Sequence, residues 1–180
     1  MKRAQLHLYY GGGKGKSTAA FGQAVRAWGQ GWRVLLAQFL KDARHPSSEI
    51  AAAAALGPRF RLLRAKLPAP AIGDPGPEGR RRLRAASREL LAQVSADLGR
   101  RRYDVVVLDE VLVACHYRLL AVADVRRAVR LAGERGARLV VLTGRWVPPA
   151  LLRDADLATE LSKIRHPFDT GAKPVHGIDY

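Results

Sequence analysis

The 180 residues suggest a single domain spanning 1–180, and the 48% share of apolar residues excludes an intrinsically disordered chain. We expect no membrane segment and no secretion signal, because no apolar run nears about 18 residues, and the single cysteine, Cys115, fits the reducing cytoplasm. The net charge of +15 attracts polyanions, but its arginine clusters at 80–84 and 100–102 lack interleaved aromatics, so we favour solvated helix faces over a nucleic-acid surface.

The first half of the chain alternates short apolar runs with helical patterns. Predicted strands cover residues 5–10, 32–39 and 60–63, and predicted helices cover 17–28 and 47–55. After the strand at 32–39, the residues up to Pro46 form a predicted loop that leads to the second helix. A second predicted loop covers 67–77, because this stretch contains four prolines and two glycines.

The second half continues the same alternation. A long helix is predicted over 78–102, and its apolar face consists of Leu83, Ala86, Leu90, Val94 and Leu98. Strands are predicted at 105–108, 138–143 and 159–164. Asp124 is expected to cap a helix that runs to about Glu134, and Pro148 is expected to open a short helix. Residues 165–180 form a predicted loop. Strands and helices in this order predict an α/β fold, a parallel sheet with helices on both faces like that of phosphate-loop NTPases.

A glycine-rich segment joins the first predicted strand to the first predicted helix. The residues expected to bind the phosphates of ATP are Gly11, Gly12, Gly13, Lys14, Gly15, Lys16, Ser17 and Thr18. Lys14 and Lys16 supply positive charge, and the Ser17 hydroxyl is a candidate Mg²⁺ ligand. The loop is one residue shorter than the common pattern, because Tyr10 stands where that pattern places its first glycine. We therefore expect a shifted phosphate register and chemistry other than ordinary attack on the γ-phosphate.

Further candidates follow the two buried strands of the second half. Asp109 and Glu110 end the first of them, where carboxylates can hold Mg²⁺ directly or through water. Arg145 ends the next strand, and Arg26 lies nine residues after Ser17; either arginine suits a phosphate clamp. The histidines show no zinc spacing, and no catalytic serine triad is recognisable, so we expect His7 and Cys115 to be structural.

Three blocks of sequence resemble the ATP:corrinoid adenosyltransferases. The first is GGGKGKSTAAFGQAVRAWGQG (11–31) with VLLAQFLK (34–41), the second is VVVLDE (105–110) with VVLTGR (140–145), and the third is the tail ELSKIRHPFDTGAKPVHGIDY (160–180). The short glycine loop is shared as well. The tail is the most specific of these blocks, because GIDY after HPFDTG is not a general nucleotide-site pattern.

The resemblance implies a function. Family members transfer the 5′-deoxyadenosyl group of ATP to the cobalt of a reduced corrinoid, release triphosphate and bind ATP in reverse along the loop. It also implies a homodimer, a reduced flavoprotein as electron donor, and Mg²⁺ held by Ser17 and Glu110, with Arg26 on phosphate. Lys14, Lys16 and Arg26 then act catalytically by neutralising charge on the leaving triphosphate.

The sequence departs from the family in several places. Gly12 stands where Asn is usual, Ser17 where Thr is usual, and the first strand begins without the N-terminal cover of longer members. Residues 65–78 contain none of the aromatics that the family places against the corrinoid. The residues alone leave two alternatives open: an ordinary phosphate-loop ATPase or small-molecule kinase, and a basic nucleotide- or nucleic-acid-binding module.

Overall fold

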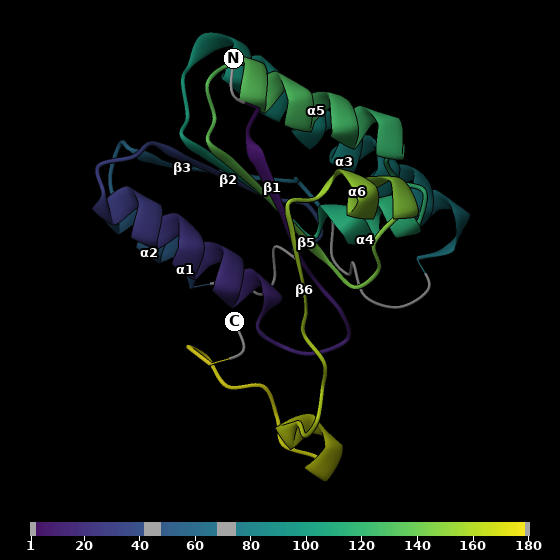
Figure 1. The fold of residues 1–180 in the computed structure, drawn as a ribbon. Coiled ribbons are helices and arrows are strands. Elements are labelled where there is room, and N and C mark those ends of the chain that lie inside the picture. Colours follow the sequence, from purple (N-terminus) through teal and green to yellow (C-terminus); the bar gives the residue numbers. More distant parts are fainter. Residues whose placement is uncertain (1–2, 42–47, 68–74, 179–180) are drawn as a thin grey trace.

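The computed structural model describes residues 3–41, 48–67 and 75–178, and the six strands in these ranges form one parallel sheet (Figure 1). The strand order is β3-β2-β4-β5-β1-β6. The strands are β1 (Gln5–Tyr10), β2 (Val34–Gln38), β3 (Phe60–Arg64), β4 (Val105–Asp109), β5 (Leu139–Gly144) and β6 (Leu157–Glu160). The predicted parallel α/β architecture is therefore confirmed.

Helices cover both faces of this sheet, as expected. One face carries α1 (Lys16–Gly29) and α2 (Glu49–Ala55), and the other carries α3 (Gly76–Arg100), α4 (Val111–His116), α5 (Val122–Glu134) and α6 (Pro149–Asp154) (Figure 1). None of the helices in the described ranges combines the length and the apolar character that crossing a bilayer requires.

The central strands are buried on both sides, which explains their unbroken apolar runs. Val105 and Val107 of β4 belong to the core under α1, whereas Val106 and Leu108 belong to the core under α3 to α6. Side chains alternate across a strand, so a strand between two helical layers needs apolar residues at every position. The apolar face predicted for the long helix is also buried, from Leu83 to Leu98.

Helix α4 is an element that the sequence analysis did not predict. Its first five residues are buried, so it lacks the polar face by which an amphipathic helix is recognised. The next helix, α5, begins earlier than expected, with Ala121 at its N-cap position. Asp124 therefore lies in the first turn and pairs with Arg127, and the prediction that it caps the helix was wrong. An acid in the first turn is still favoured by the helix dipole.

Several predicted boundaries also change. Helix α3 begins at Gly76 rather than at residue 78, because Pro77 is tolerated in a first turn, where the N–H groups have no helical partner. The helix ends at Arg100 rather than at residue 102. Strand β6 begins at Leu157, where it pairs with His7 of β1, and ends at Glu160 rather than 164. The tail is not all loop, since η1 (Pro167–Thr170) forms a 3₁₀ turn. Most of the predicted loop before residue 47 and most of the predicted loop at 67–77 lie outside the described ranges, as do the first two and the last two residues.

Candidate functional site

The order of the strands brings the candidate residues to one edge of the sheet. Strand β5 lies between β4 and β1, so the carboxyl ends of these three strands are neighbours. The glycine loop follows β1, and the Gly11 amide donates to the carbonyls of Gly144 and Arg145, 3.2 Å away in each case, at the end of β5. Ligands of open α/β sheets bind outside this edge.

The tail of the chain packs directly on the glycine loop. The Gly13 amide donates to the carbonyl of Leu161 over 2.7 Å, and the Leu161 amide donates to the carbonyl of Tyr10 over 2.7 Å. A Cβ at Gly13 would lie 2.7 Å from the Leu161 carbonyl oxygen, whereas a Cβ at Gly12 would meet nothing within 4 Å. The loop conformation therefore depends on residues nearly 150 positions later in the sequence.

This packing predicts that two neighbouring glycines differ in their tolerance of a methyl group. Gly13→Ala is expected to lower the free energy of unfolding by about 1–3 kcal/mol, because the new Cβ overlaps the main chain of Leu161 and Ser162. Gly12→Ala is the matched control and is expected to change it by less than about 0.5 kcal/mol. Urea denaturation of both variants measures the difference, and equal values would contradict the packing.

Lys16 is buried beneath the loop. Lys16 is only 8% exposed, and its Nζ atom donates to the Gly13 carbonyl over 2.5 Å. Burial lowers the pKa of Lys16, the charges of Glu110 and Asp109 raise it, and those of Arg145 and Lys41 lower it. Four other charged groups therefore act on Lys16, and a polyanion bound beside it would favour the charged ammonium.

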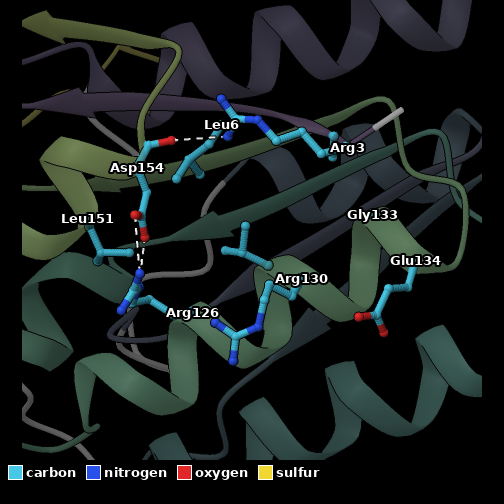
Figure 2. Close-up of a pocket in the computed structure, with 10 residues that line it drawn as sticks. Arg3, Leu6, Arg126, Arg130, Gly133, Glu134, Leu151 and Asp154 are labelled. Atoms are coloured by element: carbon cyan, nitrogen blue, oxygen red, sulfur yellow. Dashed lines mark hydrogen bonds and ion pairs between the residues drawn. The ribbon is translucent and has the colours of Figure 1, made fainter. Parts of the chain in front are cut away.

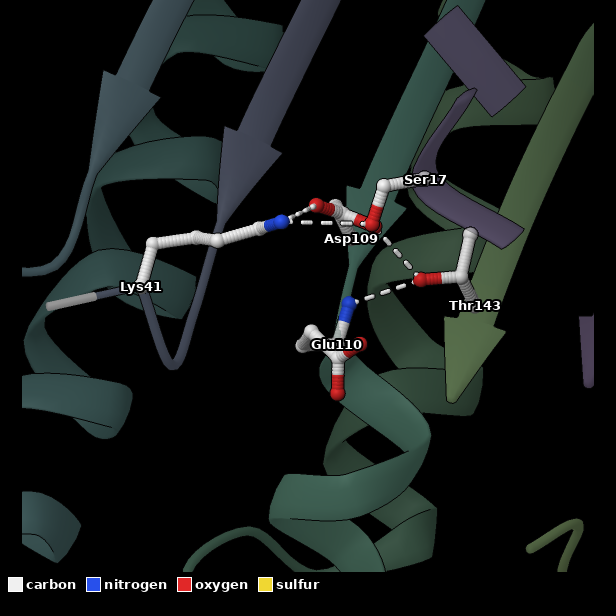
Figure 3. Close-up of polar contacts among 5 residues, drawn as sticks. All are labelled: Ser17, Lys41, Asp109, Glu110 and Thr143. Carbon is white, nitrogen blue, oxygen red and sulfur yellow. Dashed lines mark hydrogen bonds and ion pairs between the residues drawn. The ribbon is translucent and has the colours of Figure 1, made fainter. Parts of the chain in front are cut away.

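Asp109 is the centre of a hydrogen-bond network (Figure 3). Its Oδ1 atom accepts from the Ser17 hydroxyl over 2.9 Å and from the Thr143 hydroxyl over 2.7 Å. Lys41 lies on the other side, with Nζ 3.3 Å from Ser17 Oγ and 3.8 Å from Asp109 Oδ2. The backbone amide of Glu110 donates to Thr143 Oγ1 over 2.8 Å. The network ties the start of α1 to the ends of β2, β4 and β5.

Two members of this network, Lys41 and Thr143, were not among the predicted site residues. Lys41 comes three residues after the end of β2, and Thr143 is the second-to-last residue of β5. The sequence does contain a signal for both residues, since each is polar and lies at the carboxyl end of a buried strand. This signal does not identify a site by itself, because the strand order decides which strand ends are neighbours.

The oxygen atoms gathered here suit a magnesium ion that also binds phosphate. Asp109 Oδ2 is buried without a hydrogen-bond partner, and burial and the charge of Asp109 raise the pKa of Glu110. Both facts mark carboxylates that a cation would stabilise. Among the residues the structure describes, no group of three or more His, Cys, Asp or Glu could hold a metal ion. Mg²⁺ usually takes one or two carboxylates together with phosphates and waters, which fits this donor set.

The other candidates differ in their positions. Arg145 is exposed at the end of β5, and its charge lowers the pKa of both Glu110 and Lys16. Lys14 and Thr18 are exposed on the loop and the first turn of α1. Arg26 is exposed ten residues after Lys16, about 15 Å along α1, and no described contact joins it to the loop. Cys115 is buried, which raises the pKa of its thiol to about 11, so it is not an activated nucleophile.

A cavity of about 390 Å³ lies elsewhere, between the amino-terminal part of β1, α5 and α6 (Figure 2). Arg3, Arg126 and Arg130 line it together with apolar side chains, and Arg126 forms an ion pair with Asp154. No predicted site residue lines this cavity. The glycine loop follows the opposite end of β1, so the cavity is separate from the candidate site.

The family model and two curated relatives that match this chain agree on one family. The family described as "ATP:corrinoid adenosyltransferase BtuR/CobO/CobP" matches residues 2–180. A corrinoid adenosyltransferase of Escherichia coli K12 is 33% identical over 99% of this chain and 87% of its own length, and one of Pseudomonas aeruginosa is 30% identical over 99% and 85%. The ADP form of the Aeropyrum pernix ORC2 protein, a solved structure, covers 89% of this chain and 43% of its own at 17% identity and a TM-score of 0.44, which carries no functional argument.

Proposed function

The chain belongs to the ATP:corrinoid adenosyltransferase family, and from this premise we propose how its residues carry out the reaction. The activity is transfer of the adenosyl group of ATP to a corrinoid, and the family membership favours it over the ATPase or kinase alternative. We assign the reaction to the carboxyl edge of the sheet because the glycine loop and the Asp109 network meet there.

The proposed step is a substitution at C5′ of the ribose. The electron pair of cobalt(I) forms the cobalt–carbon bond, which leaves cobalt(III), and the bond from C5′ to the α-phosphate oxygen breaks with release of triphosphate. Because cobalt(I) is the nucleophile, the protein needs no nucleophilic side chain, in agreement with the buried Cys115. The remaining tasks are alignment of C5′ with the cobalt and stabilisation of the leaving group.

Each group at the edge then has a role in holding the triphosphate. The glycine loop and Thr18 offer backbone amides, and Lys16, with Lys14 and Arg145, places positive charge around the phosphate oxygens. Ser17, Asp109 and Glu110 would hold Mg²⁺, which supplies further charge neutralisation when bound. Lys41 joins this set as a cation already directed at Ser17 and Asp109. The proposed role of Arg26 is to reach the phosphates when ATP binds, since it is exposed about 15 Å along α1 from Lys16.

The wider setting of the reaction is also part of the proposal. A reduced flavoprotein is the proposed source of the electrons for cobalt(I), and a homodimer is the proposed assembly, both by similarity to the family. The absence of a second cysteine supports a reducing cytoplasm as the location. The chain is proposed to act as one nucleotide-binding domain over residues 1–180.

The products of the reaction test this function directly. Purified protein is given ATP, Mg²⁺ and chemically reduced cobalamin, while the corrinoid spectrum and the phosphorus products are followed together. We expect inorganic triphosphate to form in step with the adenosylated corrinoid and only when reduced corrinoid is present. ADP or phosphate as the main product, formed without corrinoid, would instead identify an ATPase.

A further inference from the structure

Three aromatic side chains form an exposed cluster, here called the aromatic platform and defined as His116, Tyr117 and Trp146. The rings of His116 and Trp146 are stacked, with centroids 3.9 Å apart and an interplanar angle of 17°. Tyr117 meets both rings edge-on, at centroid distances of 5.1 Å and 6.0 Å. The mutual contacts hold three large rings in one arrangement before any ligand arrives.

The platform is attached to the candidate site through both of its supporting elements. Trp146 directly follows Arg145, whose carbonyl accepts a hydrogen bond from Gly11 of the glycine loop. His116 is the last residue of α4, which begins immediately after Glu110 and spans six residues, about 9 Å. Strand β5 packs closely on α4, since a Cβ on Gly144 would lie 2.6 Å from the Cβ of Leu112. The platform is therefore rigidly connected to the residues proposed to hold triphosphate and Mg²⁺.

The platform is unusual in its exposure to solvent. Tyr117 is 59% exposed and Trp146 is 43% exposed, although the neighbouring residues of α4 and β5 are buried. Large aromatic side chains gathered on a surface mark contact sites, because covering them removes much apolar area from water. Trp and Tyr also carry an N–H or O–H group that can donate a hydrogen bond. Such donors suit a ligand that has apolar faces and polar groups at its edge.

We propose that the aromatic platform contacts the corrinoid, the second substrate, beside the triphosphate site. This inference rests on the proposed function. A corrinoid is a broad macrocycle with apolar faces and amide groups on its rim, so exposed aromatic rings that carry N–H and O–H donors match its surface. The triphosphate has the opposite chemistry and is matched by the glycine loop and the lysines. One edge of the sheet thus presents a charged half for ATP and an aromatic half for the corrinoid.

The test is a comparison of Michaelis constants for the two substrates. Trp146→Ala is expected to raise the KM for chemically reduced cobalamin roughly tenfold, because part of its apolar contact is lost. The KM for ATP is expected to stay within about twofold, since Trp146 does not take part in the phosphate network. Trp146→Phe restores an aromatic ring and is expected to bring the cobalamin KM back to within about threefold of the wild-type value. His116→Ala removes the ring that supports Trp146 and is expected to act in the same direction.

Leu152→Ala is the matched control, because Leu152 is 46% exposed on α6 and outside the platform. It is expected to leave both constants unchanged. An unchanged cobalamin KM in Trp146→Ala, or an equal rise in the ATP KM, would overturn the inference. So would a change of oligomeric mass without a change in the cobalamin KM, which would make the platform a protein contact. Adenosylation by the wild-type protein in the same assay separates these outcomes from failure of the proposed function.

Discussion

Replacing Lys16 with alanine is expected to lower the rate of corrinoid adenosylation by about 10²–10³-fold, the loss typical of one charge-stabilising group. Lys16 is the buried cation of the loop, and its ammonium lies on the carbonyl of Gly13, where the loop turns. Charge that develops on the leaving triphosphate is stabilised most strongly by a cation that is already in place and shielded from water. The initial rate of triphosphate formation with saturating ATP, Mg²⁺ and reduced cobalamin measures the effect.

The fold of this variant is expected to survive. Burial lowers the pKa of Lys16, so the charged side chain already carries a desolvation cost that alanine removes. Lys66→Ala is the matched control, because Lys66 is exposed near the end of β3 and outside the candidate site. Its activity is expected to equal that of the wild type. A Lys16→Ala protein that is folded by circular dichroism and keeps more than a tenth of the rate would remove Lys16 from the phosphate site.

The two acids at the end of β4 are expected to respond differently to removal of their charge. Asp109→Asn is expected to raise the Mg²⁺ concentration at half-maximal rate by more than about tenfold, and to lower the free energy of unfolding by about 1–3 kcal/mol. The stability loss follows from its contacts, since Asp109 is 1% exposed, accepts from Ser17 and Thr143 and faces Lys41. Magnesium titrations and urea denaturation of the same preparations give the two quantities.

Glu110→Gln is expected to weaken the Mg²⁺ dependence without a loss of stability. The folded-state pKa of Glu110 lies above the ordinary 4.5, mainly through burial and then through the charge of Asp109. Its ionised form therefore opposes folding as the pH rises through that raised pKa, and at neutral pH a neutral glutamine removes this cost. Glu89→Gln, an exposed acid on α3, is the control for loss of one charge. An unchanged magnesium titration in Glu110→Gln would leave Asp109 as the metal-binding acid.

Local patterns predicted the parts of this protein that local physics controls. The unbroken apolar run at 105–108 indicates a strand buried on both sides, and the glycines before Lys16 indicate a phosphate loop between strand and helix. Sequence reasoning failed where burial removed the periodic signal, as in α4, and where pairing set the limits of an element, as in β6. The expected cap at Asp124 was wrong because the helix begins at Val122, two residues earlier, with Ala121 at the N-cap position.

The sequence by itself determined the parallel α/β class and the grouping of Lys16, Ser17, Asp109 and Glu110 as candidates, because spacing and composition along the chain carry that information. Only the tertiary structure decided which of them meet. Placing β5 between β4 and β1 brings Thr143 to Asp109 and sets Trp146 against His116. The pairing of β2 with β4 brings Lys41 to Asp109, and the pairing of β6 with β1 lays Leu161 on Gly13. The fold also leaves Arg26 away from the loop. These contacts join residues up to about 150 positions apart, and the packing of the sheet and its helices, rather than any local preference, selects them.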